Sequence, residues 1–191
     1  MDPEIRRALA AVPPAERDAW VDALLGIDGV PADGPELPRG CVPYMPCGVD
    51  LVLEAIDRAA IDRADVFVDV GAGIGRAALL VHALTGARVV GVEIQPHLVA
   101  AARALAAALD LDRARCAFEL ADAAAAPELL AAGTVFFLYC PFSGERLAAA
   151  LSSIERAPHA RAICAVDLPP LALARFSLAH AGGALSIYTV S

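Results

Sequence analysis

The sequence predicts an α/β fold in which a mostly parallel, doubly wound sheet carries helices on both faces. From about residue 49 onward, short apolar segments rich in Val, Ile and Phe alternate with segments of helical periodicity. A glycine-rich turn at 71–75 follows the first of the apolar segments, which is typical of a strand that leads into a helix. At 191 residues, the chain is long enough for one domain with a small appendage.

The N-terminal part of the chain predicts a small helical appendage. Residues 3–11 and 14–26 are expected to form two short helices, separated by Val12-Pro13-Pro14. A loop rich in glycine and proline follows and runs to residue 40. We therefore divide the chain into an appendage at 1–40 and a main domain at 41–191. The appendage could cover a substrate cleft or form a contact between subunits.

The main domain predicts alternating helices and strands. An apolar stripe places a helix at 49–60, and Gly86 is a natural end for the helix that follows the glycine turn. Strands are expected at 66–70, 88–94, 114–120, 134–140, 161–167 and 185–190. Further helices are expected at 76–85, 97–109, 127–132, 144–157 and 169–175.

The glycine turn predicts which kind of cofactor the domain binds. Its spacing is G-x-G-x-G, and Arg76 stands where a dinucleotide fingerprint has its third glycine. Asp69, two residues before Gly71, would repel a pyrophosphate. The same carboxylate can pair with an ammonium group by a charge-assisted hydrogen bond. The turn therefore favours S-adenosylmethionine, which carries an ammonium and no phosphate.

Two further acids follow the next strands of the predicted sheet. Glu93 lies 22 positions after Gly71 and ends the second strand, where an acid typically accepts the ribose hydroxyls. Asp122 follows the third strand and is the candidate acceptor for the adenine amino group, with the backbone N–H of Ala123 beside it. Glycine turn, ribose acid and adenine acid thus occur in the order that an adenosine pocket needs.

With these motifs the chain resembles the class I S-adenosylmethionine-dependent methyltransferases, over roughly residues 41–191 and most strongly over 66–94. Locally it is similar to the non-SET histone-lysine methyltransferases and to unassigned bacterial methyltransferases. The resemblance implies a Rossmann-like fold. It also implies that Tyr44 approaches the cofactor, since Tyr44-Met45-Pro46-Cys47 looks like the Y-x-P-[ST] segment of related enzymes. The expected cofactor-binding residues are Tyr44, Asp69, Gly71, Ala72, Gly73, Gly75, Glu93, Ile94, Asp122 and Ala123.

The exit of the strand at 134–140 is the expected reaction centre. Tyr139, Cys140, Pro141 and Phe142 leave this strand at the predicted switch point of the sheet. Amino-group methyltransferases often have N-P-P-[YF] there, and this departure weakens a prediction of amide or base nitrogen as acceptor. The two aromatic rings could contact substrate or sulfonium, and Cys140 could be an ordinary buried cysteine. Asp167 could accept a substrate proton or cap the helix predicted at 169–175.

Composition limits the partners and the location of the protein. The net charge is −8, which disfavours nucleic acid as a partner. All fifteen basic residues are arginine, and from this we expect a GC-rich bacterial genome. No apolar stretch is long enough to span a membrane. Neither the four histidines nor the five cysteines show metal-ligand spacing, and the odd number of cysteines favours the reducing cytoplasm.

The sequence therefore predicts a methyltransferase with an unknown acceptor, a protein side chain or a small molecule being preferred. The histone-lysine resemblance makes lysine one candidate acceptor. A nicotinamide-dependent oxidoreductase is an alternative, opposed by Asp69 and Arg76. A catalytically silent cofactor-binding protein is another. The N-terminal helices could hold an oligomer together.

Overall fold

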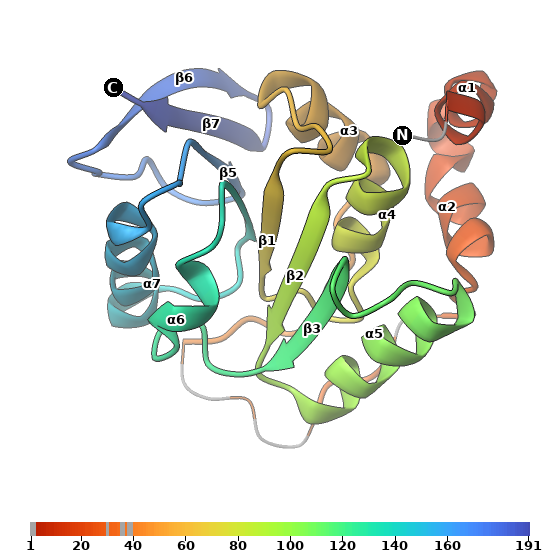
Figure 1. Cartoon of the computed structure of the whole chain (residues 1–191), viewed down its shortest axis with the longest axis horizontal. Coiled ribbons are helices and arrows are strands. Elements are labelled where there is room, and N and C mark those ends of the chain that lie inside the picture. The colour runs from red at the N-terminus through yellow and green to blue at the C-terminus, as the bar shows by residue number, and fades with distance from the viewer. Residues whose placement is uncertain (1–2, 30, 35–36, 38–39) are drawn as a thin grey trace.

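The computed structural model describes residues 3–29, 31–34, 37 and 40–191. Its centre is a seven-stranded sheet with the order β3-β2-β1-β4-β5-β7-β6 (Figure 1). The first five strands of this order are parallel, and the last two pair antiparallel. The predicted α/β class with a mostly parallel sheet is confirmed. The strands are β1 (Val66–Val70), β2 (Arg88–Glu93), β3 (Cys116–Leu120), β4 (Val135–Tyr139), β5 (Ala162–Val166), β6 (Phe176–Gly182) and β7 (Leu185–Val190).

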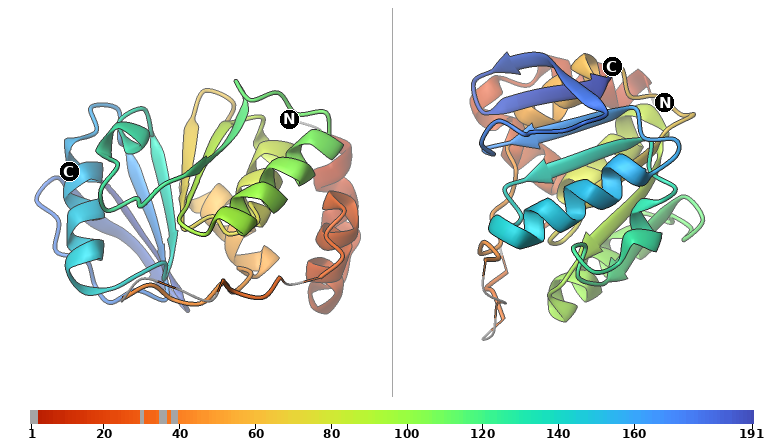
Figure 2. Two further views of the ribbon diagram at one scale, coloured as in Figure 1. Left: turned by 90° about the horizontal axis from the view of Figure 1, so that it is seen from below. Right: turned by 90° about the vertical axis from the view of Figure 1, so that its left-hand side faces the viewer.

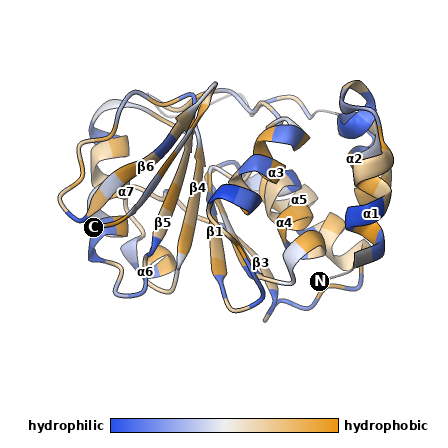
Figure 3. Cartoon of the chain, turned by 90° about the horizontal axis from the view of Figure 1, so that it is seen from above, coloured by the Kyte–Doolittle hydropathy of each residue, from blue (hydrophilic) through white to orange (hydrophobic). Residues whose placement is uncertain are grey.

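Helices cover both faces of this sheet, as Figure 2 shows from its edge. On one face, apolar residues of α3 (Val49–Arg58), α4 (Arg76–Thr85) and α5 (Pro96–Ala108) form a core with strand residues such as Phe67 and Phe137. On the other face, α6 (Pro127–Leu130) and α7 (Gly144–Arg156) pack on Val68, Phe136 and their neighbours. The central strands are apolar on both sides (Figure 3), as a doubly covered parallel sheet requires.

The N-terminal helices pack on the outer side of α4. They are α1 (Pro3–Ala11), the short 3₁₀ helix η1 (Pro14–Glu16) and α2 (Arg17–Leu25). The segment predicted as one helix at 14–26 thus begins with a 3₁₀ turn and ends before Gly26, which has φ 73°. Leu9, Val21 and Leu25 are buried in the same core as α4.

The switch point of the sheet lies where the sequence predicts it. β1 pairs with β2 on one side and with β4 on the other, and the chain then winds outward in both directions. In such a sheet the loops after β1 and β4 separate and leave a crevice beyond the strand ends. The glycine turn follows β1, and Cys140 follows β4. The fold thus brings the two most informative motifs of the sequence to one place.

The C-terminal part differs from the prediction. No helix forms at 169–175, and β6, which the sequence analysis does not predict, begins at Phe176. Pro169 and Pro170 have no N–H to donate, and the segment is held instead by Tyr188 and Glu155, which accept from the amides of residues 171, 174 and 175. Gly183, with φ 55°, turns the chain from β6 into β7. The predicted helix is therefore wrong, and a β-hairpin ends the chain.

Candidate functional site

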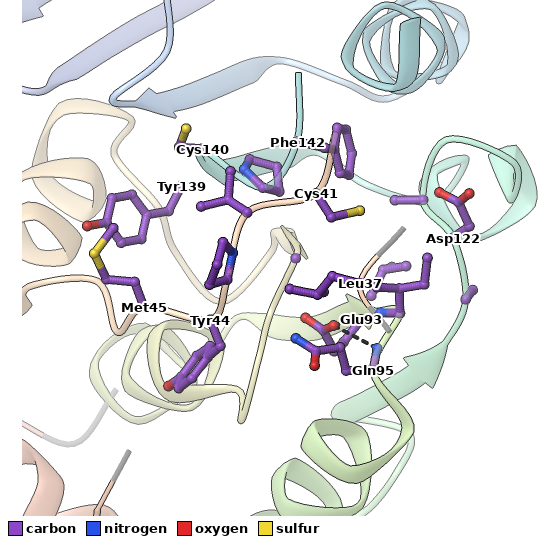
Figure 4. A pocket seen from close by; sticks show the side chains of 18 of the residues that line it. Leu37, Cys41, Tyr44, Met45, Glu93, Gln95, Asp122, Tyr139, Cys140 and Phe142 are labelled. Carbon is purple, nitrogen blue, oxygen red and sulfur yellow. Dashed lines mark hydrogen bonds between the residues drawn. The ribbon is translucent and has the colours of Figure 1, made fainter. Parts of the chain in front are cut away.

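A pocket lies beyond the carboxyl ends of the parallel strands and is covered by residues 41–45, which we call the covering segment; Leu37 also lines it. The empty space in it, which opens to solvent, is about 840 Å³. Figure 4 shows the side chains that line it, with Asp122 at one end and Tyr139 and Met45 at the other.

The glycine turn closes one wall of this pocket. Gly71, Gly73 and Gly75 all have positive φ, as the strand-to-helix turn requires. A Cβ on Gly71 would lie 2.6 Å from Cβ of Pro141, and a Cβ on Gly73 would overlap the ring of Tyr44. Glycine is therefore needed at both positions, because other parts of the protein approach the backbone closely. The same packing brings Tyr44 and Pro141 to the turn.

Glu93 connects the turn to the end of β2. Its Oε2 accepts from the amide of Gly73 at 2.9 Å, and its Oε1 accepts from the amides of Ile94 and Gln95, both at 2.8 Å. The side chain is buried but lines the pocket. A carboxylate can accept about four hydrogen bonds, so capacity remains for a ligand hydroxyl. This arrangement fits the predicted contact with a ribose.

Asp69 lies below the pocket and not in its lining. It is on β1 and is 4% exposed. Burial raises the pKa of its carboxyl to about 7, and the nearby negative charge of Glu93 adds to this, while the backbone amide of Ala78 opposes it. Below about pH 7 the carboxyl is therefore mostly protonated, and a nearby cation would favour its ionised form. A positively charged ligand group would supply that cation.

Asp122 follows β3 and lines the far end of the pocket. Its Oδ2 accepts from the Arg146 guanidinium, and its Oδ1 accepts from the amide of Ala124 at 3.0 Å. The predicted adenine acceptor is thus part of an ion pair that joins β3 to α7. Ala123 is buried and lies in the pocket lining beside it.

The four residues that leave β4 all line the pocket. Cys140 has φ 39°, and Phe142 is buried and forms an isolated bridge with Cys41. Burial raises the pKa of the Tyr139 phenol, and nearby Cys47, Asp167 and Cys140 add to this. Tyr139 lies beside Met45 in Figure 4, at the end away from Asp122.

The covering segment contributes residues that the sequence analysis does not predict. Asp33 accepts from the amide of Tyr44 at 2.7 Å and from Nε2 of Gln95 at 2.9 Å, which ties the segment to the start of α5. The amide of Val42 donates to the carbonyl of Pro141 at 3.2 Å. No local sequence signal marks these contacts, because they join residues far apart in the chain. The unpredicted lining residues are Leu37, Cys41, Val42, Pro43, Met45, Val92, Gln95 and Ala121.

Most of the predicted site residues therefore come together. Tyr44, Gly71, Glu93, Ile94, Asp122, Ala123, Tyr139, Cys140, Pro141 and Phe142 line the pocket. Asp69, Ala72, Gly73 and Gly75 stand behind its wall. Ala72 is buried, and its amide donates to the carbonyl of Val92 at 3.1 Å. A cationic nucleoside fits this set, because the lining supplies carboxylates and apolar walls and holds no cation among the residues described.

A sequence model of the family described as "Methyltransferase domain" matches residues 61–174, which is more than half of the chain. The chain belongs to this family. The methyltransferase function predicted from the sequence is thereby confirmed, and S-adenosylmethionine is the cofactor that the assignment implies. Neither the family nor the fold supports the nicotinamide-dependent alternative. No curated protein matches the chain.

Solved structures of methyltransferases share the fold. An RNA methyltransferase from Salinibacter ruber, in complex with S-adenosyl-L-homocysteine, is 24% identical with a TM-score of 0.61, covering 76% of this chain and 94% of its own. A putative methyltransferase, yhhF, from Escherichia coli is 17% identical with a TM-score of 0.62, covering 78% and 89%. The magnesium protoporphyrin IX methyltransferase of Synechocystis PCC 6803, with bound SAM, is 17% identical with a TM-score of 0.58, covering 74% and 77%.

In the ranges that the structure describes, no helix has both the length and the apolar character to span a membrane. Within those same ranges, no group of three or more His, Cys, Asp or Glu side chains is arranged to hold a metal ion.

Proposed function

We propose that this methyltransferase binds S-adenosylmethionine between the glycine turn and Glu93 and methylates a protein side chain or a small molecule. The observation that carries the proposal is the position of Glu93, whose carboxylate lines the pocket while holding the amide of Gly73. This contact fixes the acid against the turn before any ligand enters. A ribose held there would lie over the ends of β1 and β2.

The cofactor-binding roles follow the order of the strands. Asp122 and Ala123 after β3 are assigned to the adenine, and Glu93 and Ile94 after β2 to the ribose. Gly71 and Tyr44 are assigned to the amino-acid end, with Asp69 behind them to balance its ammonium. When bound, S-adenosylmethionine supplies an electrophilic methyl group on a sulfonium sulfur. The protein then has to align the acceptor atom and exclude water, which explains how a site without a strong base can act.

The acceptor is proposed on the basis of charge. The net charge of −8 and the lack of described cations in the pocket lining support a protein side chain or small molecule over nucleic acid. The Salinibacter ruber RNA methyltransferase shares the fold at 24% identity, which does not specify an acceptor for this chain. We also infer a bacterial origin and a cytoplasmic location from the sequence, and a contact between subunits through the N-terminal helices.

Calorimetric titration with S-adenosylhomocysteine tests the proposed cofactor site. Glu93→Ala and Asp69→Ala are each expected to weaken binding by about 1–3 kcal/mol, because each leaves ligand groups without a partner. Glu128→Ala, on the exposed side of α6, is the control and should bind like the wild type. Unchanged binding in both site variants would refute the assignment.

Two further measurements address the alternatives. NAD should give no heat in the same titration, and its binding at the site would favour an oxidoreductase. Transfer of a labelled methyl group from S-adenosylmethionine to a component of a cell extract would exclude a catalytically silent cofactor-binding protein.

A further inference from the structure

Asp167 follows β5 at the end of the pocket that the proposed cofactor leaves open. The strand order places the cofactor contacts after β3, β2 and β1, and the remaining part of the lining follows β4 and β5. Asp167 lies one strand beyond Cys140 in this row. Tyr139 and Met45 lie opposite Asp122 in Figure 4, and the negative charge of Asp167 is close enough to help raise the pKa of the Tyr139 phenol, which burial raises most. This leaves the side of Asp167 for the acceptor.

The backbone at this end is strained in two adjacent strand exits. Cys140 and Asp167 have φ of 39° and 51°, although neither is glycine. The other described non-glycine residues with positive φ, Ala60 and Asp110, follow helices, where such a conformation is common. Strain of this kind at a pocket persists where the surrounding structure imposes it, and it aims a side chain. The amide of Asp167 is held by the carbonyl of Ala184 at 2.9 Å.

The side chain of Asp167 has no structural role among the residues that the structure describes. Capping of a helix at 169–175 is ruled out, because this segment is not helical. The carboxylate is exposed and makes no hydrogen bond or ion pair with a described residue. By contrast, Glu93 accepts from three backbone amides, and Asp122 is paired with Arg146. Asp167 is thus the lining carboxylate whose hydrogen-bonding capacity is uncommitted in the described structure.

The charges of the other lining residues indicate which kind of ligand group could pair with Asp167. The described lining residues include no Arg, Lys or His, and Arg146 is paired with Asp122 at the far end, so an anionic acceptor beside Asp167 would meet like charge. Met45 and Tyr139 give the open end an apolar and aromatic wall, on which an alkyl chain or a cation can rest. A positively charged hydrogen-bond donor could pair with Asp167 and rest on Met45 and Tyr139 at the same time.

We propose that Asp167 binds the acceptor and selects a cationic amine by pairing with its ammonium group. This inference rests on the proposed function, since it takes the other end of the pocket to hold the cofactor. Asp167 would hold the acceptor nitrogen by a charge-assisted hydrogen bond beside Tyr139 and Met45. The ammonium would then lose one proton to solvent water, and the free amine would form its N–C bond as the methyl–sulfur bond breaks and S-adenosylhomocysteine leaves. Neutral acceptors of the same shape would bind more weakly, and anionic ones would be rejected.

Three probes of equal chain length test the charge preference: hexylamine, hexanol and hexanoate. Each is titrated into the protein saturated with S-adenosylhomocysteine, and binding is followed by NMR chemical shifts. We expect hexylamine to bind about tenfold more tightly than hexanol, with hexanoate weakest, because a hydrogen bond to a charged group exceeds a neutral one. Absent hexylamine binding, or equal binding of the three probes, would overturn the proposal.

Asp167→Asn tests whether Asp167 is the source of this preference. The variant should lose the tenfold advantage of hexylamine and keep the wild-type affinity for S-adenosylhomocysteine. Asp110→Asn is the matched control, because Asp110 is also an exposed aspartate with positive φ, at 53°, and lies outside the pocket lining. An amine preference that persists in Asp167→Asn would overturn the proposal. Loss of S-adenosylhomocysteine binding by the wild type would instead refute the proposed function.

Discussion

Asp69 has an unfavourable position in the unliganded protein, and the pH dependence of stability should reveal it. Burial raises its pKa to about 7 in the folded state, against the usual 3.8 of an aspartate, and Glu93 adds to this. A raised carboxyl pKa contributes stability at low pH that is lost as the pH rises through the folded-state value. Asp69→Asn should therefore be more stable than the wild type, with a gain that grows between about pH 4 and pH 7 and is constant above.

Thermal unfolding of Asp69→Asn and wild type across this pH range gives the comparison. Asp65→Asn is the opposite control, since Arg161, the amide of Asp62 and Thr134 lower the pKa of Asp65 despite its burial. Removing that charge should reduce stability by a constant amount between pH 4 and pH 8, and the loss should shrink only when the pH is lowered further, through the pKa of Asp65. A stability gain for Asp69→Asn that does not change with pH would contradict the account of Asp69.

Gly73 and Tyr44 should show a direct steric coupling. Gly73→Ala places a methyl group in the ring of Tyr44 and also requires alanine at φ 55°. Gly183 is the matched control, because it has the same φ of 55° with no atom within 4 Å of the added Cβ. Urea unfolding should show Gly183→Ala destabilised by about 1 kcal/mol, which is the backbone cost alone. Gly73→Ala should lose about 1–2 kcal/mol more.

Tyr44→Ala should remove most of that extra loss when it is combined with Gly73→Ala. The double variant should then be more stable than the sum of the single effects by about 1 kcal/mol. Strict additivity would mean that the ring does not lie against Gly73 in solution.

At the residue scale, local spacing predicted the positions of the glycine turn and Glu93, but it did not predict pairings between residues far apart in the chain. The glycine turn and Glu93 lie where the sequence places them, because a strand, a turn and a helix are fixed by neighbours in the chain. The pairing of Asp122 with Arg146 was not predicted, since it depends on how α7 packs beside β3. The contact of Asp33 with Gln95 was missed for the same reason.

At the scale of elements, Arg76 is the main polar link between α4 and the N-terminal helices. Its guanidinium donates to Asp22 at 2.6 Å, to Asp18 at 3.0 Å and to the carbonyl of Cys47 at 2.5 Å, and it is 5% exposed. Arg76→Met should cost about 2–4 kcal/mol in urea unfolding, because the buried carbonyl of Cys47 loses its donor and the carboxylates of Asp18 and Asp22 lose their cation.

Arg113→Met is the control for this prediction, because Arg113 pairs with Glu119 and its side chain is 73% exposed. An exposed pair of this kind should change stability by less than about 1 kcal/mol. Equal losses in the two variants would mean that the contacts of Arg76 contribute no more than a surface pair.

The C-terminal hairpin is the region where the secondary structure predicted from the sequence is wrong. A helix was expected at 169–175 because the alternation of strands and helices continues up to β5. The two prolines start a loop instead, and the hydroxyl oxygen of Tyr188 accepts a hydrogen bond of 2.9 Å from the amide of Leu171. Since β7 pairs antiparallel with β5, no crossover helix is needed on that side of the sheet. The pairing of distant strands decided this region, and the local pattern did not show it.

At the scale of the molecule, the structure bears on whether residues 1–40 form a separate unit. The sequence placed a boundary at residue 40 from the composition of the loop alone. The structure buries Leu9, Val21 and Leu25 in one core with α4 and adds the buried contacts of Arg76. Helices as short as α1 and α2 have little stability by themselves and depend on such packing. We therefore expect the N-terminal helices to unfold together with the sheet.

The single tryptophan of the chain allows this expectation to be measured without altering the protein. Trp20 lies in α2 and packs against the core, so its fluorescence reports on the N-terminal helices. Far-UV circular dichroism reports on all helices and strands. In urea the two signals should follow one transition with the same midpoint, as a two-state unit requires. A fluorescence midpoint well below that of circular dichroism would show that the appendage detaches first, and the boundary at residue 40 would then separate two folding units.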